Sequence, residues 1–470
     1  MFRSLAVLVL MVGVLGYVCA WAQTDTGTPE PKPAYTIQDE TPPTQPGPKP
    51  AFTYPDTTPS LDFLTGSIEN SSITLGIGGG FAFDSNGYPS ATTNSHQNRW
   101  LVTIAPSISL QQFFPKFSWH VRYAAGLQSF NQINGPSNYN NNQLYQSAGG
   151  GFIWQFARRW QLLADETYHY SANPFDSFLT IPGTPTANNP NAVAYLPLTN
   201  VEQNSAILTV TNQISKRDTI SFTGTENYRY TSTYNIVTTV PFYNLTSYGG
   251  RANYSHQVSR RLNLGAGYDY NSLDFGHGQQ RSGIQTIEVT GEYLIRPGMT
   301  ITGWIGPQYT TTKTLVPVLV PTIPPTIVFE PRYDSLWSTA VGANYGWQTR
   351  RDAVRAGFSR SVSDGGGIIA TSVVNTANGN YRRQLTAKWS ASAGARYLHS
   401  TSTLTSSRYF HNFFFSATVS YQLKKQFLID ATYLRAHQTQ SNAFVINPGT
   451  YNDNRVGVNI SYHWTHPLGR

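Results

Sequence analysis

The sequence predicts an all-β protein: a closed antiparallel transmembrane β-barrel of about 18 strands, with 16 strands as the alternative. Three observations predict this fold class. Long segments alternate apolar and polar residues, short and long connectors alternate along the chain, and tryptophans collect beside the short connectors. Together they predict strands with one face toward lipid and one toward an interior, joined by short periplasmic turns and long extracellular loops.

The first residues have the features of an export signal. Arg3 precedes an apolar run over residues 5–17, and Ala20-Trp21-Ala22 offers small residues at a cleavage site. This pattern predicts a cleaved secretory signal peptide over residues 1–22. A lipoprotein anchor on Cys19 is the alternative, although Val18 before it is not the small residue that such a site usually needs. Cleavage removes the only cysteine, so we expect neither disulfides nor thiol chemistry.

Residues 23–65 are predicted to be a periplasmic linker. Ten prolines fall between residues 24 and 60, and few apolar residues accompany them. Such a composition cannot build a core, so we expect this segment to be extended and disordered. The barrel is then expected over residues 66–470.

The alternation is clearest in long segments of the barrel region. Residues 262–271, 389–397 and 456–464 each place apolar side chains on one face and Gly, Ser, Asn or other polar residues on the other. These segments run to about 10–14 residues, which suits tilted strands that cross a bilayer better than strands of soluble proteins. Charged residues make up 12% of the chain and aromatic residues 13%. Low charge with many aromatics favours a wall in contact with lipid over a soluble β-protein.

Short connectors, most of them basic, recur between pairs of strands. They fall at Pro115-Lys116, Arg158-Arg159, Lys216-Arg217, Arg260-Arg261, Arg296-Pro297-Gly298, Arg350-Arg351, near Lys388, and Lys424-Lys425. Eight turns join eight pairs of strands, and one further strand at each end gives the count of 18. A basic rim suits anionic phospholipid headgroups or periplasmic polymers, and ordinary solvated turns explain it equally well.

The tryptophans test this layout independently. Those next to the short turns are predicted to form a membrane girdle, because indole rings settle at the boundary between water and lipid. They are Trp119, Trp154, Trp160, Trp347, Trp389 and Trp464. Tyrosines such as Tyr170 and Tyr230 fall near the opposite strand ends.

Over residues 70–464 the chain resembles bacterial outer-membrane β-barrel proteins of the porin type. Barrels of this class usually finish in a strand whose apolar residues alternate up to a terminal aromatic, which the assembly machinery recognises. The matching residues are Val456, Val458, Ile460, Tyr462 and Trp464. The tail 465–470 departs from the pattern. The resemblance implies the outer membrane of a Gram-negative-type bacterium, with membrane lipids and the barrel-assembly machinery as partners.

Strand parity predicts which charged side chains face the interior of the barrel. The basic candidates for pore lining are Arg122, Arg355, Arg382, Lys388, Arg396 and Arg455. The acidic candidates are Asp269, Glu288, Glu292 and Asp430. The basic set concentrates in the last third of the chain and the acidic set in the middle, which predicts adjacent wall sectors with a transverse field. The alternative is that these charges pair with one another and hold water.

The segment 315–331 is apolar yet rich in proline, so we expect it to be a loop and not a paired strand. Its marked residues are Leu315, Pro317, Pro321, Pro324 and Phe329. Three interpretations stay open: a constriction that folds into the pore, a hydrophobic surface tip for a partner, or packing on neighbouring loops.

These features predict a channel for passive diffusion of small hydrophilic solutes. An exporter of an anionic polysaccharide and a structural or adhesive barrel with a plugged lumen are the alternatives. The sequence shows no Ser/His/acid grouping, phosphate loop or paired-cysteine motif, so we expect no enzyme, no cofactor, no metal and no nucleic-acid partner. A homo-oligomer is an open expectation, since nothing in the sequence marks a contact face.

Overall fold

The computed structural model describes the chain from Ser71 to Leu468 with gaps. The described residues are 71–85, 98–130, 142–171, 199–233, 244–276, 278–320, 326–364, 370–404, 408–441 and 450–468. The predicted signal peptide and linker lie outside them.

The described part of the chain is built from strands alone. They are β1 (Ser72–Asp84), β2 (Arg99–Phe113), β3 (Phe117–Phe130), β4 (Asn142–Ala157), β5 (Trp160–Ser171), β6 (Thr199–Gln213), β7 (Asp218–Thr233), β8 (Leu245–Gln257), β9 (Leu262–Phe275), β10 (Gln280–Arg296), β11 (Met299–Val320), β12 (Thr326–Gln348), β13 (Asp352–Ser363), β14 (Ser372–Gln384), β15 (Trp389–Ser402), β16 (Tyr409–Lys424), β17 (Phe427–Ser441) and β18 (Thr450–Pro467). Among these residues no helix is long and apolar enough to cross a membrane.

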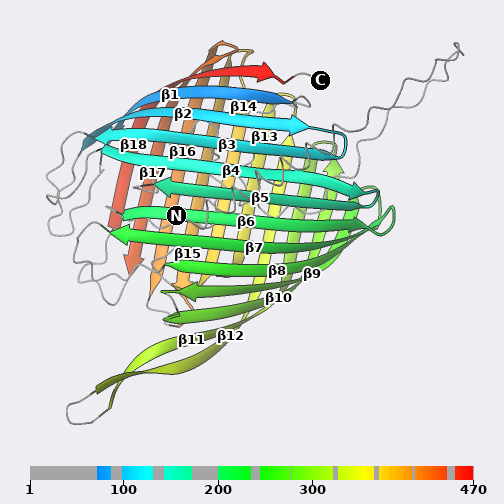
Figure 1. The fold of residues 1–470 in the computed structure, drawn as a ribbon, viewed down its shortest axis with the longest axis vertical. Helices are drawn as coiled ribbons and strands as arrows, with labels where there is room; N and C mark the ends of the chain where they lie inside the picture. Colours follow the sequence, from blue (N-terminus) through cyan, green and yellow to red (C-terminus); the bar gives the residue numbers. More distant parts are fainter. Residues whose placement is uncertain are drawn as a thin grey trace, which may run out of the picture. The chain divides into compact units, whose positions relative to one another are not determined.

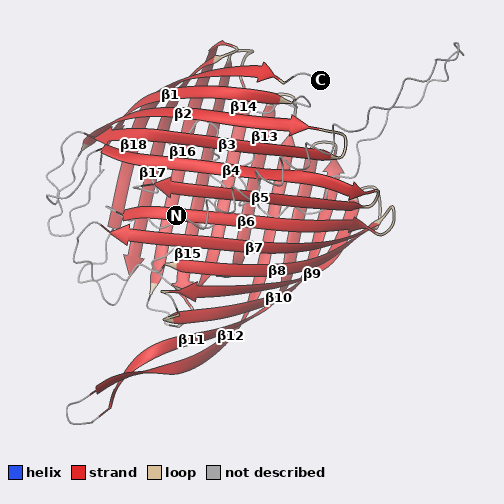
Figure 2. Ribbon diagram, in the orientation of Figure 1, coloured by secondary structure: helices blue, strands red, loops and turns tan. Residues whose placement is uncertain are grey.

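Every strand pairs antiparallel with its neighbours in the chain, and β1 closes the sheet on β18. In Figure 1 the blue β1 lies beside the red end of the chain, and Figure 2 shows an unbroken wall of strands. Ser72 pairs with Pro467 and Asp84 with Arg455, so the seam runs along the whole of β1. The predicted closed antiparallel barrel of 18 strands is confirmed.

The two faces of the wall have an inverted distribution of polarity. On the outer face large apolar side chains are exposed, such as Phe81 at 50%, Ile287 at 61% and Val289 at 60%. On the inner face of β10, Ser282 is 0% exposed and Glu288 2% exposed. A water-soluble protein buries the first kind and exposes the second. The wall is therefore suited to an apolar solvent outside and a polar environment inside.

The outer face also carries the tryptophans predicted for the girdle. Trp160 and Trp389 are the first residues of their strands, and Trp347 is the last but one of β12. Trp154 and Trp464 lie near the ends of β4 and β18 and are 45% and 40% exposed. With Trp119 on β3, all six lie within a few residues of the end of the barrel that carries the short turns, called here the short-turn end. Their contact with lipid stays a prediction.

The expectation of a loop over Leu315–Pro331 is wrong for the described residues 315–320 and 326–331. β11 and β12 are the longest strands, and they remain paired through Val320 and Thr326. Figure 1 shows this hairpin extending past the ends of the other strands. Pro321 and Pro324 lie outside the described residues.

The direction of the backbone N–H groups explains why proline is tolerated here. Leu315 N donates to Gln279 O on the β10 side (3.0 Å), and Gln348 N donates toward the start of β11 (2.7 Å). Because these directions alternate along a strand, the nitrogens of Pro317 and Pro331 face the two outer edges of the hairpin. Among the described residues neither edge pairs with another strand there, because β10 begins at Gln280, opposite Thr314, and β13 pairs with β12 only as far as Val341. Both prolines occupy edge positions that need no N–H donor.

Candidate functional site in the barrel interior

The inner face of the wall is the candidate site, and nine of the ten predicted pore-lining residues lie on it. Cross-strand partners share a face, so the pairing registers place each side chain. The nine are Arg122, Asp269, Glu288, Glu292, Arg355, Arg382, Arg396, Asp430 and Arg455. Lys388 lies instead in the turn before β15 and is exposed. That prediction is wrong because the Thr386 side chain closes a turn onto Lys388 N and Trp389 N, which delays the start of the strand. Whether the nine line an open passage stays a prediction.

A buried charge cluster lies at the seam of the barrel. The Asp84 carboxylate on β1 accepts from Arg99 Nε on β2 and from an Arg455 guanidinium nitrogen on β18, both at 2.8 Å. These three side chains are 0–1% exposed. Asp453, also buried, is in electrostatic contact with the three and shares a side-chain hydrogen bond with Asp84. The cluster joins the first, second and last strands at the end of the barrel opposite the short turns.

The predicted acidic sector in the middle of the chain contains an arginine that sequence reasoning missed. Arg251 on β8 forms an ion pair with Glu288 on β10. It also lies opposite Asp269 of β9 in the ladder. Gly267 of β9 lies opposite Glu288 in the ladder, and a Cβ there would lie 3.3 Å from Glu288 Oε1. The glycine therefore leaves room for the Arg251 and Glu288 side chains to meet across β9. The sector is thus partly neutralised. The alternation in residues 251–255 carried the signal, because it places Arg251 on the same face as Asn253 and Ser255.

A second mixed cluster links β3 to β5. His120 Nε2 lies 3.2 Å from Asp165 Oδ2, and the Arg122 guanidinium is in electrostatic contact with the same carboxylate. The side chains meet across β4 because Gly151 lies between them in the ladder. A Cβ at Gly151 would lie 2.5 Å from Asp165 Oδ2, so the glycine makes this contact possible.

The end of the β13–β14 hairpin leaves the wall and lies against its inner face. We call residues 361–364 with 370–372 the inner hairpin end. β13 stops pairing with β12 at Arg360, yet it continues to pair with β14 through Ser363 and Ser372. Val362 N donates to the Gln308 side chain on β11 at 2.8 Å, although β12 separates β11 from β13 in the wall. The inner hairpin end therefore crosses the interior side of β12.

Three kinds of contact hold the inner hairpin end. Arg229 on β7 forms an ion pair of 2.6 Å with Asp364, and both side chains are less than 10% exposed. Thr371 accepts from the Gln280 amide (3.1 Å) and is hydrogen-bonded to Ser282 (2.6 Å) on β10. Apolar contacts complete the set, with Val362 and Ala370 in one buried cluster with residues of β8, β9 and β10: Leu245, Leu273, Phe275 and Ile284. Arginine, amide, hydroxyl and apolar side chains from β7 to β10 thus form one docking surface inside the barrel.

The basic sector predicted for the last third of the chain lies on three adjacent strands. Arg355, Arg382 and Arg396 project inward from β13, β14 and β15. Between residues 352 and 424 the chain has only two carboxylates, Asp352 on the outer face of β13 and Asp364 in the inner hairpin end. On these three strands the described inner face therefore carries arginines and no carboxylate, since Asp352 faces outward.

Within the described ranges, no group of three or more His, Cys, Asp or Glu side chains is arranged to hold a metal ion. The interior offers ion pairs and hydrogen bonds across strands.

Comparison with known proteins gives structural likenesses alone. No family model matches the sequence, and no curated protein matches it. OccAB4 from Acinetobacter baumannii is 9% identical, covers 84% of this chain and 99% of its own, and has a TM-score of 0.42. The outer membrane protein OpdK from Pseudomonas aeruginosa is 9% identical with the same coverage and a TM-score of 0.40. The FrpB iron transporter from Neisseria meningitidis is 10% identical, covers 86% of this chain and 83% of its own, with a TM-score of 0.39.

Proposed function

We propose that this protein is an outer-membrane channel for the passive diffusion of small hydrophilic solutes. The observation that carries the proposal is the inverted polarity of a closed wall, with exposed Ile287 and Val289 outside and buried Ser282 and Glu288 inside. A closed sheet satisfies its backbone hydrogen bonds internally, as a lipid environment requires. A barrel of about 18 strands is also too wide for its own wall side chains to fill.

The arginines of β13–β15 support a preference for anions. Arg355 is exposed within the barrel, and both Arg355 and Arg382 lie within four residues of the short-turn end. Charges that line a mouth enrich counter-ions in it and so bias permeation. The paired clusters at Asp84 and at Glu288 contribute less to this bias, since each combines both signs.

A second candidate is a structural or adhesive barrel whose lumen is closed. The inner hairpin end favours it, because this segment occupies interior space and is fixed by an ion pair, hydrogen bonds and apolar contacts. The two candidates differ in one property, which is whether ions cross the barrel. The export of an anionic polysaccharide is a third candidate function, because the arginine sector would suit such a polymer.

Conductance through a planar bilayer separates these functions. The chain without residues 1–22 is refolded, shown to be folded, and inserted, and single-channel currents are recorded in a salt gradient. Stepwise currents with a reversal potential of the anion-selective sign support the proposal. Silence from folded and inserted protein overturns it in favour of a closed barrel. Block of the current by an anionic polysaccharide, with no block by small anions, points to polymer export.

A further inference from the structure

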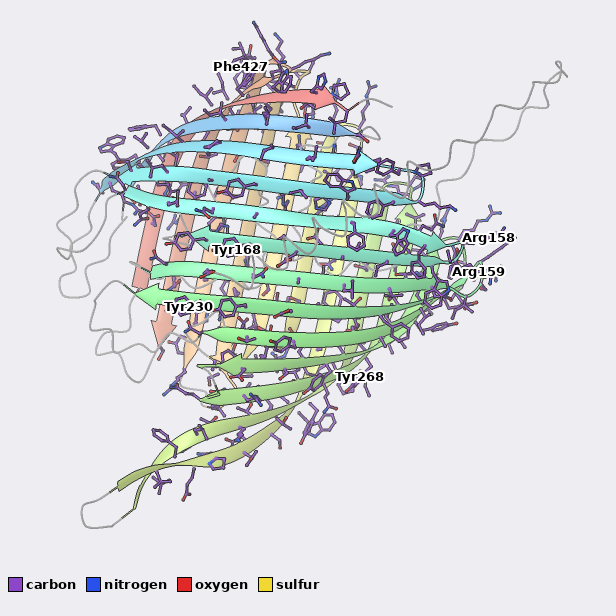
Figure 3. All side chains as sticks on the ribbon, in the orientation of Figure 1. Arg158, Arg159, Tyr168, Tyr230, Tyr268 and Phe427 are labelled. Carbon is purple, nitrogen blue, oxygen red and sulfur yellow. The ribbon has the colours of Figure 1, made fainter. Side chains whose placement is uncertain are left out.

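The short-turn end of the barrel carries an unbroken series of exposed cations. We call this set the basic rim, and each of the eight short turns contributes at least one member. Its members are Lys116, Arg158, Arg159, Lys216, Arg217, Arg260, Arg261, Arg296, Arg350, Arg351, Lys388, Lys424 and Lys425, and all are exposed. Figure 3 shows Arg158 and Arg159 at this end, away from Tyr168 and Tyr230 on the same wall.

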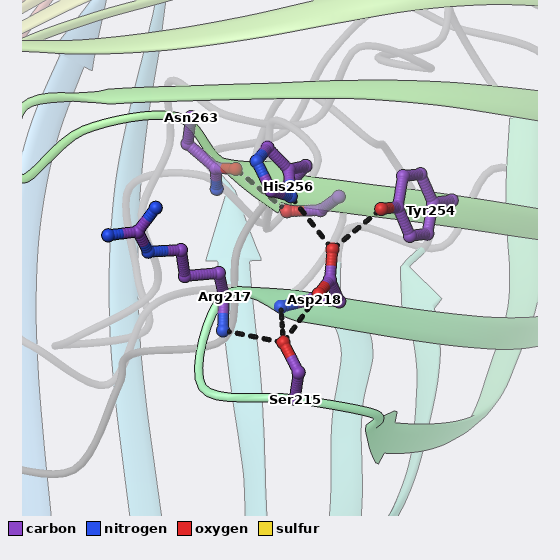
Figure 4. A network of polar contacts seen from close by, with 7 residues as sticks. Ser215, Arg217, Asp218, Tyr254, His256 and Asn263 are labelled. Carbon is purple, nitrogen blue, oxygen red and sulfur yellow. Dashed lines mark hydrogen bonds and ion pairs between the residues drawn. The ribbon is translucent and has the colours of Figure 1, made fainter.

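The nearest carboxylates do not neutralise the basic rim. Asp218 accepts hydrogen bonds from Ser215 and from Tyr254 OH (2.6 Å), and lies 2.8 Å from His256 Nδ1. Figure 4 shows this network, with the Arg217 guanidinium directed away from the carboxylate. Asp352 is held in the same way at another turn, where Tyr381 OH donates to it at 2.8 Å. In these fully described turns neither carboxylate forms an ion pair with a member of the basic rim.

Side-chain hydrogen bonds fix the backbone of the turns that present these cations. Ser215 Oγ accepts from the backbone N–H groups two and three residues later, at 3.0 and 3.1 Å. Ser259, Thr349 and Thr386 make the same pair of bonds in three further turns. Because the Ser or Thr side chain at the start of each turn binds the backbone N–H groups of the turn, the basic side chains that follow point outward, away from the turn.

The basic rim borders the tryptophans of the outer face. Trp154 and Trp160 flank the turn with Arg158 and Arg159, and Trp389 follows Lys388 directly. Indole rings settle at the boundary between hydrocarbon and headgroups. Residues one to four positions beyond them, at about 3.3 Å per extended residue, fall at the depth of the headgroups themselves.

We propose that the basic rim binds the anionic phospholipid headgroups of the leaflet beside the short turns and enriches these lipids around the barrel. The even spread of cations over all eight turns fits an anionic surface that surrounds the protein, whereas a compact partner would contact only a few turns. Each cation near an anionic membrane surface favours an anionic lipid about fivefold. The proposal requires that the barrel sit in a bilayer, but it does not require that the barrel conduct.

Lipid selectivity at the protein boundary tests the proposal directly. The full barrel is reconstituted in phosphatidylcholine bilayers, and spin-labelled phosphatidylglycerol is compared with spin-labelled phosphatidylcholine by electron spin resonance. We expect phosphatidylglycerol to be several-fold over-represented among the immobilised lipids, with the preference lost at 1 M salt, where the screening length is about 3 Å.

Two double variants with the same loss of charge locate the effect. R158Q/R159Q removes two cations from the basic rim, and K313Q/R332Q removes two exposed cations from the β11–β12 hairpin at the other end. Circular dichroism is used to check that both variants fold. The proposal predicts a lower preference in the first variant and an unchanged one in the second. Equal lipid preference in the parent chain and both variants overturns it. Capture of a soluble polyanion such as dextran sulfate by the rim, without any lipid preference, also overturns it and assigns the rim to a periplasmic polymer.

Discussion

Arg229 on β7 and Asp364 beyond the end of β13 lie 135 positions apart in the chain, and their side chains meet at 2.6 Å inside the barrel. Five strands of the wall, β8 to β12, lie between β7 and β13. The ion pair therefore joins two parts of the wall that are not neighbours in the sheet, because the inner hairpin end lies against the inner face of the strands between them. It is the ion pair that fixes this segment to β7.

Asp364→Asn is expected to release the inner hairpin end. The substitution leaves the buried Arg229 without its partner charge, and breaking one side of a buried ion pair costs about 3–5 kcal/mol. We expect a larger and more variable single-channel conductance than in the parent chain. The exchanged pair R229D/D364R restores opposite charges and should return the current toward the parent value. If Asp364→Asn leaves the conductance unchanged, this contact does not limit the passage.

Asp84→Asn is expected to weaken the closure of the barrel. Two buried guanidiniums, those of Arg99 and Arg455, share this one carboxylate. Its loss should lower the free energy of unfolding by about 3–5 kcal/mol, measured by urea titration of the micelle-bound protein with tryptophan fluorescence. Asp334→Asn is the matched control, because the Arg332–Asp334 pair is exposed and contributes at most about 1 kcal/mol. Equal effects of the two substitutions would contradict the role assigned to the seam.

Neutralising the arginines near the short-turn mouth is expected to reduce anion preference. R355Q/R382Q removes two inward cations, and the reversal potential in a salt gradient should move toward that of a non-selective pore. Arg383→Gln provides the control, since Arg383 follows Arg382 on β14 and faces outward. If Arg383→Gln shifts the reversal potential by the same amount, charge near the short-turn end sets the selectivity whichever face of the wall it lies on.

In the β11–β12 hairpin, proline should be tolerated only at every second position, where the backbone N–H faces the free edge. At Ser335 the backbone N–H faces the free edge of β12, so Ser335→Pro should leave the hairpin intact. At Leu336 the N–H faces β11, so Leu336→Pro removes a ladder hydrogen bond and should open the hairpin. Hydrogen exchange of the hairpin amides distinguishes the two variants. Comparable protection in both would mean that the N–H directions assigned to β12 are wrong.

Local patterns were sufficient to predict the wall. The alternation of apolar and polar residues and the eight short turns predicted 18 strands, because each of these patterns depends only on residues close together in the sequence. The β11–β12 hairpin was missed because proline was taken to exclude pairing, whereas Pro317 and Pro331 occupy edge positions. Strand parity alone could have placed Arg251 on the inner face, and the pairing register of the folded barrel places it opposite Asp269.

The inner hairpin end was beyond the reach of such patterns. Asp364 follows the last residue of β13, so no alternation assigns it a face. Its partner Arg229 comes from a strand six places away in the wall, and only the folded barrel brings the two together. Lys388 shows the same limit on a smaller scale, since a hydrogen bond within the turn shifted the start of β15 beyond it.

The seam between β1 and β18 has a consequence for the timing of synthesis. Asp84 and Arg455 lie 371 positions apart, so β1 is made long before its partner exists. At about 5–20 residues per second, β1 waits roughly 20–75 s for β18 to leave the ribosome. During that wait the backbone donors and acceptors on the edge of β1 that will face β18 are open to any other extended chain. We therefore expect the chain to need a factor that covers strand edges from the first strand to the last, and a shortage of that factor should harm this protein before it harms barrels with fewer strands.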